Sequence, residues 1–229
     1  MIDLSTWNLT VPASHDSTLI STQQLANGYR SPYFRRNDDG SLTFWAPVTG
    51  GTTSGSAYPR SELRETGRDG TPVFWKYDRA NDRLAAVLTV ERLPSNEKLI
   101  VGQIHSKDEP GSMRDPLLKI RYRKVDGIGR VEAVVRRRPG ENACDSHLLL
   151  DGVRPGDQFG YRIDLDSRGK LQVAASSEHG QSTTFSQQVD PRWKKQNLYF
   201  KAGVYVLDNQ GPSTEGGRAT FHWLDSAHR

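Results

Sequence analysis

Short segments of alternating apolar and polar residues, separated by turn signals, recur along almost the whole chain. Such alternation is typical of strands that bury one face, because successive side chains of a strand point to opposite sides. Turn signals at Asp39-Gly40, Asp126-Gly127 and Asp166 to Gly169 mark three hairpins. No sustained helical periodicity and no internal repeat interrupts this pattern. The sequence therefore predicts an all-β fold, a β-sandwich or jelly roll.

No linker divides the predicted strands, which indicates one domain over residues 1–229. A chain of 229 residues and 25.6 kDa is large enough to bury the core of one β-sandwich. One short helix is predicted from Ser21 to Gly28, because a capping serine begins this segment and a glycine ends it. The predicted strands cover residues 7–11, 33–36, 41–46, 60–65, 83–92, 99–106, 117–125, 130–136, 159–165, 170–175, 198–205 and 218–224.

The chain carries a modest excess of basic residues. Its 31 Lys and Arg against 27 Asp and Glu give a formal net charge of +4, which favours an anionic partner such as nucleic acid or an acidic polysaccharide. The densest basic run, Arg136 to Arg138, has no interleaved aromatic residues, so we interpret it as a solvated strand end. No known nucleic-acid-binding module is visible, and we expect no nucleic-acid partner.

The sequence contains no candidate membrane span, no export signal and a single cysteine. The apolar runs are far shorter than the roughly 20 residues of a membrane span, so no membrane partner is expected. Residues 1–30 lack a basic region followed by an apolar one, which predicts either a cytoplasmic protein or the mature form of an exported one. Cys144 is the only cysteine, so no intramolecular disulfide forms, and a structural or incidental thiol is expected.

Residues 60–65 place two positive charges and one negative charge on one face of a strand. Arg60, Glu62 and Arg64 share that face, whereas Leu63 takes the opposite one. Guanidinium groups fork onto carboxylates, so Glu62 can hold both arginines in place for binding. The alternative is a surface ion-pair ladder without a ligand.

Two further strands carry polar groups on one face. Gln103 and His105 share a face, and Ile104 between them points to the core. Alone, this pair is more typical of a solvated strand face than of a functional site. The second strand aligns four residues, with a glycine whose missing side chain leaves room for a ligand to approach the sheet. These residues are Tyr199, Lys201, Gly203 and Tyr205.

If the three faces lie on one sheet, the resulting groove suits a particular chemistry. The sequence offers no paired carboxylates for glycoside hydrolysis, no phosphate-binding loop, no Ser-His-Asp order and no metal-ligand spacing of histidines. We therefore expect neither a metal nor a cofactor. The C5 proton of a uronate becomes acidic when the neighbouring carboxylate is neutralised, as Arg60 and Gln103 can do. His105 then suits the base and Tyr205 the acid of a β-elimination.

The motifs Arg60-Ser-Glu-Leu-Arg64, Gln103-Ile-His105 and Tyr199-Phe-Lys-Ala-Gly-Val-Tyr205 resemble the three signature strands of the alginate lyases of polysaccharide lyase family 7. The resemblance extends from Trp7 to the final predicted strand. It implies a jelly-roll β-sandwich of two antiparallel sheets, in which the concave sheet forms the active cleft. The loops at residues 49–56 and 208–217 would act as lids.

The resemblance also assigns roles by position. It implies that Arg60 and Gln103 neutralise the substrate carboxylate, that His105 is the base and that Tyr205 is the acid. It further implies a set of cleft residues that bind substrate or orient these groups. That set comprises Glu62, Arg64, Lys201 and Tyr199. The chain departs from the common family pattern after Tyr205, where Val206-Leu207 replaces Asn-Gln.

The resemblance implies a lyase that acts on alginate. An open cleft on a sheet can admit a long chain, so we expect cutting within the polymer, and we expect a monomer. In guluronate the C5 proton and O4 lie on opposite faces, so a separate base and acid are needed. Ile104 is the residue that the family associates with guluronate-containing stretches, so guluronate or mixed blocks are expected. Two alternatives stay open: a lyase for another polyuronate such as polyglucuronate, and a non-catalytic module that binds acidic polysaccharides.

Overall fold

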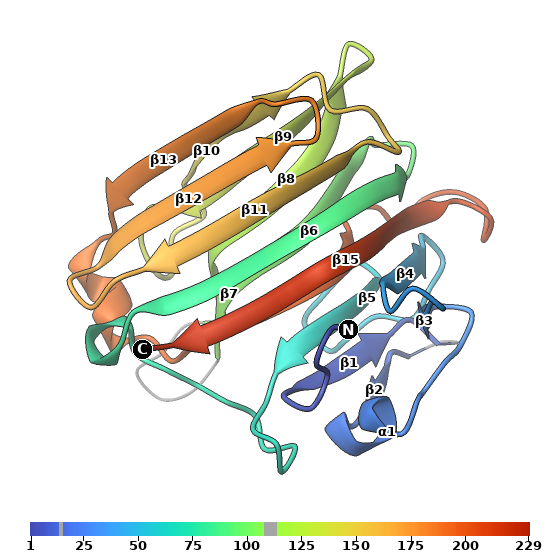
Figure 1. Ribbon diagram of the computed structural model, residues 1–229, viewed down its shortest axis with the longest axis horizontal. Coiled ribbons are helices and arrows are strands. Elements are labelled where there is room, and N and C mark those ends of the chain that lie inside the picture. The colour runs from blue at the N-terminus through green and yellow to red at the C-terminus, as the bar shows by residue number, and fades with distance from the viewer. Residues whose placement is uncertain (14–15, 108–113) are drawn as a thin grey trace.

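The computed structural model describes residues 1–13, 16–107 and 114–229, which form two antiparallel β-sheets packed face to face (Figure 1). All pairings between the named strands are antiparallel, and buried apolar side chains from both sheets form one core cluster between them. The expectation of an all-β sandwich is confirmed. No helix in the described ranges is long and apolar enough to span a bilayer.

One sheet has eight strands. They are β1 (Trp7–Val11), β2 (Thr18–Ile20), β5 (Arg60–Glu65), β7 (Lys98–Ser106), β8 (Pro116–Val125), β9 (Ile128–Arg136), β10 (Cys144–Asp151) and β14 (Leu198–Val206). Their order in the sheet is β10-β9-β8-β7-β14-β5-β1-β2. β14 therefore lies between β5 and β7, although its residues are distant from both in the sequence.

The other sheet has seven strands. They are β3 (Phe34–Arg36), β4 (Leu42–Pro47), β6 (Asp82–Arg92), β11 (Gln158–Leu165), β12 (Lys170–Ser177), β13 (Ser182–Gln188) and β15 (Gly216–His228). Their order is β13-β12-β11-β6-β15-β4-β3, and this sheet lies in front of the eight-stranded one in Figure 1. Two short 3-10 turns, η1 (Tyr77–Arg79) and η2 (Pro191–Lys195), complete the elements together with one helix.

The helix α1 (Thr22–Ala26) lies inside the predicted range of 21–28. Ser21 caps it: its hydroxyl accepts from the Gln24 backbone N–H at 3.2 Å, and the Gln24 side chain accepts from the Ser21 backbone N–H at 2.9 Å. This reciprocal pair is a capping box. Gly28 follows with φ +84°, a left-handed conformation that glycine adopts without strain.

Three strands were not predicted, and all three lie at sheet edges. β2 and β10 are the outer strands of the eight-stranded sheet, and β13 is an outer strand of the other. The side chains of β13 are mostly exposed, so its sequence carries no apolar alternation. β10 begins at Cys144, in the polar segment Glu141 to Asp145, which shows no apolar alternation. Edge strands that bury little surface lack the apolar alternation from which strands are predicted, so they are not recognised in the sequence.

The strand faces were predicted correctly for the three motif strands. Leu63, Ile104 and Phe200 are fully buried in the core, while Arg64 and His105 lie on the outer face of the eight-stranded sheet. The predicted alternation therefore puts all the polar faces on the same side of one sheet.

Gly203 has a different role from the one expected. It has φ +140°, and a Cβ at this position would lie 2.6 Å from the Ser61 carbonyl oxygen and 2.9 Å from the Glu62 Cα. A glycine is required here because the β5 backbone approaches closely. On the other side of β14, the pairing with β7 shifts register between Ala202 and Tyr205. The space beside it is filled by protein rather than left for a ligand.

Candidate active site

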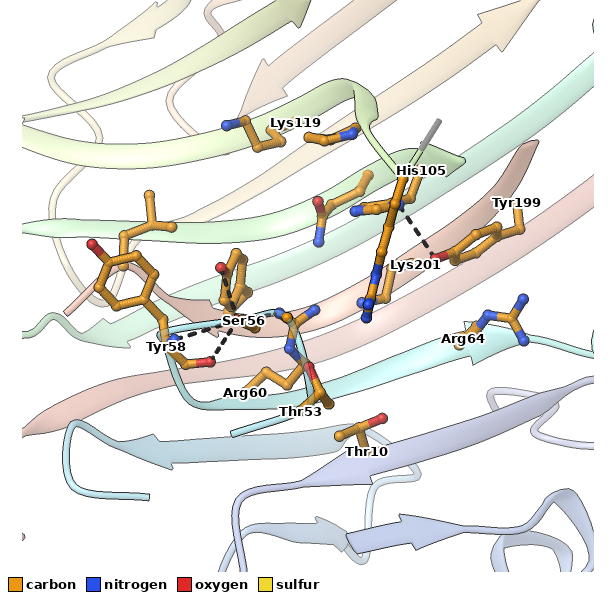
Figure 2. A pocket seen from close by; sticks show the side chains of 16 residues that line it. Thr10, Thr53, Ser56, Tyr58, Arg60, Arg64, His105, Lys119, Tyr199 and Lys201 are labelled. Carbon is orange, nitrogen blue, oxygen red and sulfur yellow. Dashed lines mark hydrogen bonds between the residues drawn. The ribbon is translucent and has the colours of Figure 1, made fainter. Parts of the chain in front are cut away.

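A cleft of about 480 Å³ lies on the outer face of the eight-stranded sheet. It crosses five adjacent strands in the order β8, β7, β14, β5 and β1, with contributions from neighbouring loops (Figure 2). The lining residues are Thr10, Thr53, Gly55, Ser56, Tyr58, Arg60, Arg64, Gln103, His105, Arg114, Pro116, Lys119, Tyr199, Lys201, Tyr205 and Leu207. Seven of the eight residues proposed from the sequence are in this set, and Glu62 is not.

The strand register brings the proposed residues together. Lys201 on β14 is the pairing partner of Arg64 on β5 and of Gln103 on β7. On the same strand, Tyr199 pairs with His105 and Tyr205 pairs with Arg60. The three polar faces therefore lie side by side on one sheet, as the sequence hypothesis required.

Glu62 lies beneath the cleft floor with 1% of its surface exposed. Its carboxylate accepts from Arg60 Nη1 at 3.1 Å, from Lys201 Nζ at 2.5 Å and from Gln103 Nε2 at 2.5 Å. Burial acts to raise the pKa of Glu62, but Lys201 and Arg60 outweigh it and hold that pKa below its ordinary value. Glu62 is therefore an ionised anchor for three cleft side chains.

Lys201 is nearly buried and is ion-paired only with Glu62 in the described part of the chain. Burial lowers the pKa of Lys201 to about 8, an effect that Arg60 strengthens and Glu62 opposes. Arg60 and Lys201 share the single negative charge of Glu62, so the floor of the cleft keeps a net positive charge at neutral pH.

His105 is held in one tautomer by its backbone neighbour. Its Nδ1 lies 2.8 Å from the Ser106 carbonyl oxygen, which can only accept, so Nδ1 carries the proton and Nε2 keeps a lone pair. Burial, followed by the charge of Lys201, lowers the pKa of His105 to about 3. The imidazole is therefore neutral at physiological pH and can accept a proton at Nε2.

A loop serine joins two of the proposed catalytic residues. Ser56 Oγ accepts from Arg60 Nη2 at 2.9 Å and lies 3.3 Å from the hydroxyl of Tyr205. The Arg60 guanidinium carbon lies 4.1 Å from the centre of the Tyr205 ring, in cation–π contact. Figure 2 shows these contacts of Ser56 as dashed lines. The guanidinium and the phenol are thus held against each other.

Tyr199 packs between His105 and Arg64. Its hydroxyl lies 3.3 Å from His105 Nδ1, and the Arg64 guanidinium carbon lies 4.2 Å from the centre of its ring. The same guanidinium also lies 4.8 Å from the centre of the Phe74 ring. Arg64 is therefore fixed by aromatic rings, which leave its charge available to an anion.

The cleft is strongly cationic. Within the described ranges, no aspartate or glutamate lines it. Its lining includes five basic side chains, namely Arg60, Arg64, Arg114, Lys119 and Lys201. A cavity with this charge attracts and retains a polyanion.

The loops that were expected to act as lids differ in position. Thr53, Gly55 and Ser56 of the 49–56 loop line the cleft, whereas the described lining includes no residue of 208–217. That second segment contacts the residue that follows the first loop, because the Asn209 side chain donates to the Ala57 carbonyl oxygen at 3.2 Å. Its last two residues, Gly216 and Gly217, begin β15. Lid movement stays a prediction for both loops.

Several lining residues were not identified from the sequence. Ser56 and Tyr58 lie in a loop, where no periodic pattern marks a functional side chain. Lys119 alternates with Arg121 and Arg123 along β8, so its face was predictable once the strand was known to border β7. Its proximity to the proposed catalytic residues required the strand order.

A group with metal-ligand spacing lies elsewhere. Ligand atoms of Asp157, Glu178 and His179, on the periphery of the seven-stranded sheet, lie within 4.8 Å of one another. The two carboxylates already accept backbone N–H groups, from Arg154 and Gln158 respectively. Exposed clusters of this kind are common, and we assign it no function.

Comparison with known proteins agrees with this geometry. A family model described as alginate lyase matches residues 2–228. An alginate lyase of Klebsiella pneumoniae is 27% identical over 282 residues, covering 99% of this chain and 89% of the relative. The crystal structure of an alginate lyase from Pseudomonas aeruginosa is 46% identical, with a TM-score of 0.91, and covers 99% of this chain and 100% of that one.

A further similar structure contains an oligosaccharide. It is a variant of alginate lyase A1-II', a member of polysaccharide lyase family 7, in complex with a substrate written GGMG. This structure is 33% identical, has a TM-score of 0.84, and covers 99% of this chain and 94% of that one.

Proposed function

The chain belongs to the alginate lyases of polysaccharide lyase family 7, and we propose that it cleaves alginate within the polymer by β-elimination. The observation that carries this proposal is the His105 imidazole in the cleft, whose Nδ1 donates to the Ser106 carbonyl oxygen and leaves Nε2 with a lone pair. Its Nε2 can accept a proton beside the donors Arg60 and Gln103, in a cleft that no acidic side chain lines among the described residues.

The first step is neutralisation of the uronate carboxylate. A guanidinium has five N–H donors and a carboxamide has two, so Arg60 and Gln103 keep donors after binding Glu62. Their hydrogen bonds to the substrate carboxylate delocalise the charge that develops when the adjacent C5 proton leaves. Glu62 positions both donors and need not touch the sugar.

The elimination itself requires one base and one acid. His105 Nε2 takes the C5 proton, the electrons of the C5–H bond form the C4=C5 double bond, and the C4–O4 bond breaks. Tyr205 gives its phenolic proton to the departing O4. The products are a new reducing end and an unsaturated uronate at the new non-reducing end, and no oxidant or reductant is needed.

Separate residues for base and acid favour guluronate. The C5 proton and O4 of guluronate lie on opposite faces of the sugar, so the proton donor and the proton acceptor must be different groups, a requirement that His105 on β7 and Tyr205 on β14 meet. The mixed oligosaccharide bound by the A1-II' variant supports acceptance of mixed sequences. The cleft crosses five strands, roughly 19 Å at the usual strand spacing, so several sugars fit and internal cutting is favoured.

The test is the absorbance of the unsaturated product. We expect wild-type protein to release it from alginate, and His105→Ala and Tyr205→Phe to reduce the rate at least about a hundredfold, because each removes one proton transfer. His179→Ala is a matched control on the exposed surface and should retain wild-type activity.

A panel of purified polymers separates the alternatives. Polyguluronate, polymannuronate, mixed alginate and polyglucuronate would be compared for initial rate and for the size of early products. Fastest cleavage of polyglucuronate would replace the proposed substrate, and release of only short products from the outset would contradict internal cutting. Binding of alginate without any absorbance would indicate a non-catalytic module.

A further inference from the structure

Lys119 extends the row of polar groups across the cleft floor by one strand. The register runs from Arg64 on β5 to Lys201 on β14, then to Gln103 on β7 and to Lys119 on β8. Figure 2 shows Arg64 and Lys119 on opposite sides of Lys201 and His105. The Lys119 side chain is half-buried and lines the cleft.

Lys119 differs from its basic neighbours because it has no carboxylate partner among the described residues. Arg121 and Arg123 bind opposite oxygens of Glu132, each at 2.7 Å, and Arg136 lies 3.6 Å from Asp115. Lys119 forms no such ion pair with any residue that the structure describes. Its basic neighbours Arg121, Arg123 and Arg136 are therefore each paired with a carboxylate, whereas Lys119 is not.

The surroundings of Lys119 disfavour its charge. Burial lowers the pKa of Lys119, the Cys144 thiol acts in the opposite direction, and Arg136 and Arg121 lower that pKa further. A half-buried ammonium near other cations is costly unless an anion approaches it. The cleft beside it is the open side from which an anionic ligand can come.

We propose that Lys119 forms a separate subsite for the carboxylate of a uronate next to the reacting one. This proposal rests on the proposed function, in which Arg60 and Gln103 hold the reacting carboxylate. Adjacent strands are about 4.8 Å apart, comparable to the length of one pyranose unit in an extended chain. A cation one strand beyond Gln103 therefore meets the neighbouring sugar.

The chemistry of lysine defines what this subsite accepts. An ammonium is a point charge with rotatable donors, so it binds carboxylates from several directions, whereas a guanidinium selects one planar geometry. The Lys119 subsite therefore accepts a guluronate or a mannuronate at this position. Selectivity between the two must arise at the reacting sugar.

The experiment measures kcat and KM on alginate oligosaccharides of increasing length. In the wild type, KM falls with each added sugar that fills a subsite. We expect Lys119→Met to abolish one step of this fall and to raise KM about tenfold for hexasaccharides, with kcat changed less than twofold. Lys119→Arg should restore most of the affinity because it keeps the charge.

Lys170→Met is the matched control. Lys170 is an exposed lysine on β12, in the other sheet, so this variant loses the same charge without touching the cleft. Three outcomes would each overturn the subsite. They are an equal KM increase at all oligosaccharide lengths, a KM increase no larger than that of Lys170→Met, and a loss of kcat at unchanged KM. If the wild type is active and one of these outcomes is found, only the Lys119 subsite is refuted. If the wild type is inactive on every polyuronate, the proposed function is refuted as well.

Discussion

At the scale of single residues, Glu62 controls the charge of the cleft floor. It neutralises only one of the two cations that bind it, Arg60 and Lys201, and the uncompensated charge lies close to His105. Together with burial, this charge keeps the imidazole of His105 unprotonated, but it also makes that imidazole a weak base in the free protein. In the proposed mechanism, a bound uronate carboxylate supplies the missing negative charge and thereby raises the basicity of His105.

This coupling predicts different pH dependences for the free and the bound enzyme. The pKa of His105 in the free protein is about 3, so the acid limb of kcat/KM set by His105 should lie below about pH 4. Substrate binding adds a negative charge that favours the imidazolium, so the acid limb of kcat should lie at higher pH. Initial rates across pH 3 to 8 on polyguluronate check this. Coincident limbs would show that the substrate charge does not reach His105.

At the scale of elements, a bulge in β7 positions the Gln103 and His105 pair. The β7 register shifts between Ile100 and Gly102, just before the pair begins. Tyr161 of the opposite sheet donates its hydroxyl to the Val101 carbonyl oxygen at 3.0 Å, and its ring occupies the space above Gly102. The bulge is therefore held from within the core, by the sheet that carries no cleft residue.

We predict that Gly102→Ala damages both stability and activity. The new Cβ would lie 2.7 Å from Tyr161 Cζ, so the ring must move away from Val101. Overpacking of this kind costs about 1–3 kcal/mol, and a shift of Gln103 and His105 should lower kcat/KM at least about tenfold. Denaturant unfolding and steady-state kinetics measure the two effects.

A double-mutant cycle tests the cause. Tyr161→Phe alone loses one buried hydrogen bond, about 1 kcal/mol, but it also removes the atom closest to the new Cβ. Gly102→Ala should therefore cost less in the Tyr161→Phe background than in the wild type. Strict additivity of the two changes would argue against this contact.

At the scale of the whole molecule, a charged group joins the two sheets. His228 near the end of β15 has Nδ1 at 2.6 Å from Asp82 Oδ1 and Nε2 at 2.6 Å from Glu65 Oε1. Glu65 lies on β5, beside the cleft residue Arg64, and its other oxygen accepts from the Phe200 backbone N–H at 3.1 Å. The imidazolium thus connects the C-terminal strand to β5 and β14, two adjacent strands of the sheet that carries the cleft.

This link predicts a pH-dependent contribution to stability. Burial opposes the charge of His228, but the hydrogen bonds and charges of Asp82 and Glu65 prevail and raise its pKa to about 9. Because the pKa of His228 is higher in the folded than in the unfolded protein, His228 stabilises the fold fully below about pH 6.5. This contribution is lost as the pH rises through about 9. We expect the stability difference between wild type and His228→Gln to shrink by about 2 kcal/mol from pH 6 to pH 10.

Comparing two proteins cancels the opposite effect of Lys201, whose lowered pKa adds stability as the pH rises above about 8. Urea unfolding at both pH values gives the difference. A difference that is independent of pH would mean that His228 contributes by packing against Trp75 and Phe200 rather than by charge.

Local alternation was sufficient to predict much of the site. It assigned Arg60, Glu62 and Arg64 to one face of a strand and Gln103 and His105 to one face of another, because the direction of a side chain in a strand depends only on its position. It failed at β13, which buries too little surface to show a pattern, and at Ser56, which lies in a loop.

By itself, the sequence determined the all-β class, the inner and outer faces of the motif strands, and the family. Only the tertiary structure decided that β14 lies between β5 and β7, that Glu62 is buried beneath three cleft side chains, and that Lys119 extends the cationic row. The physical reason is the separation in the sequence of the residues that determine each feature. Side-chain direction follows from neighbouring residues, whereas strand order, burial and pKa arise from residues far apart in the chain that packing brings together.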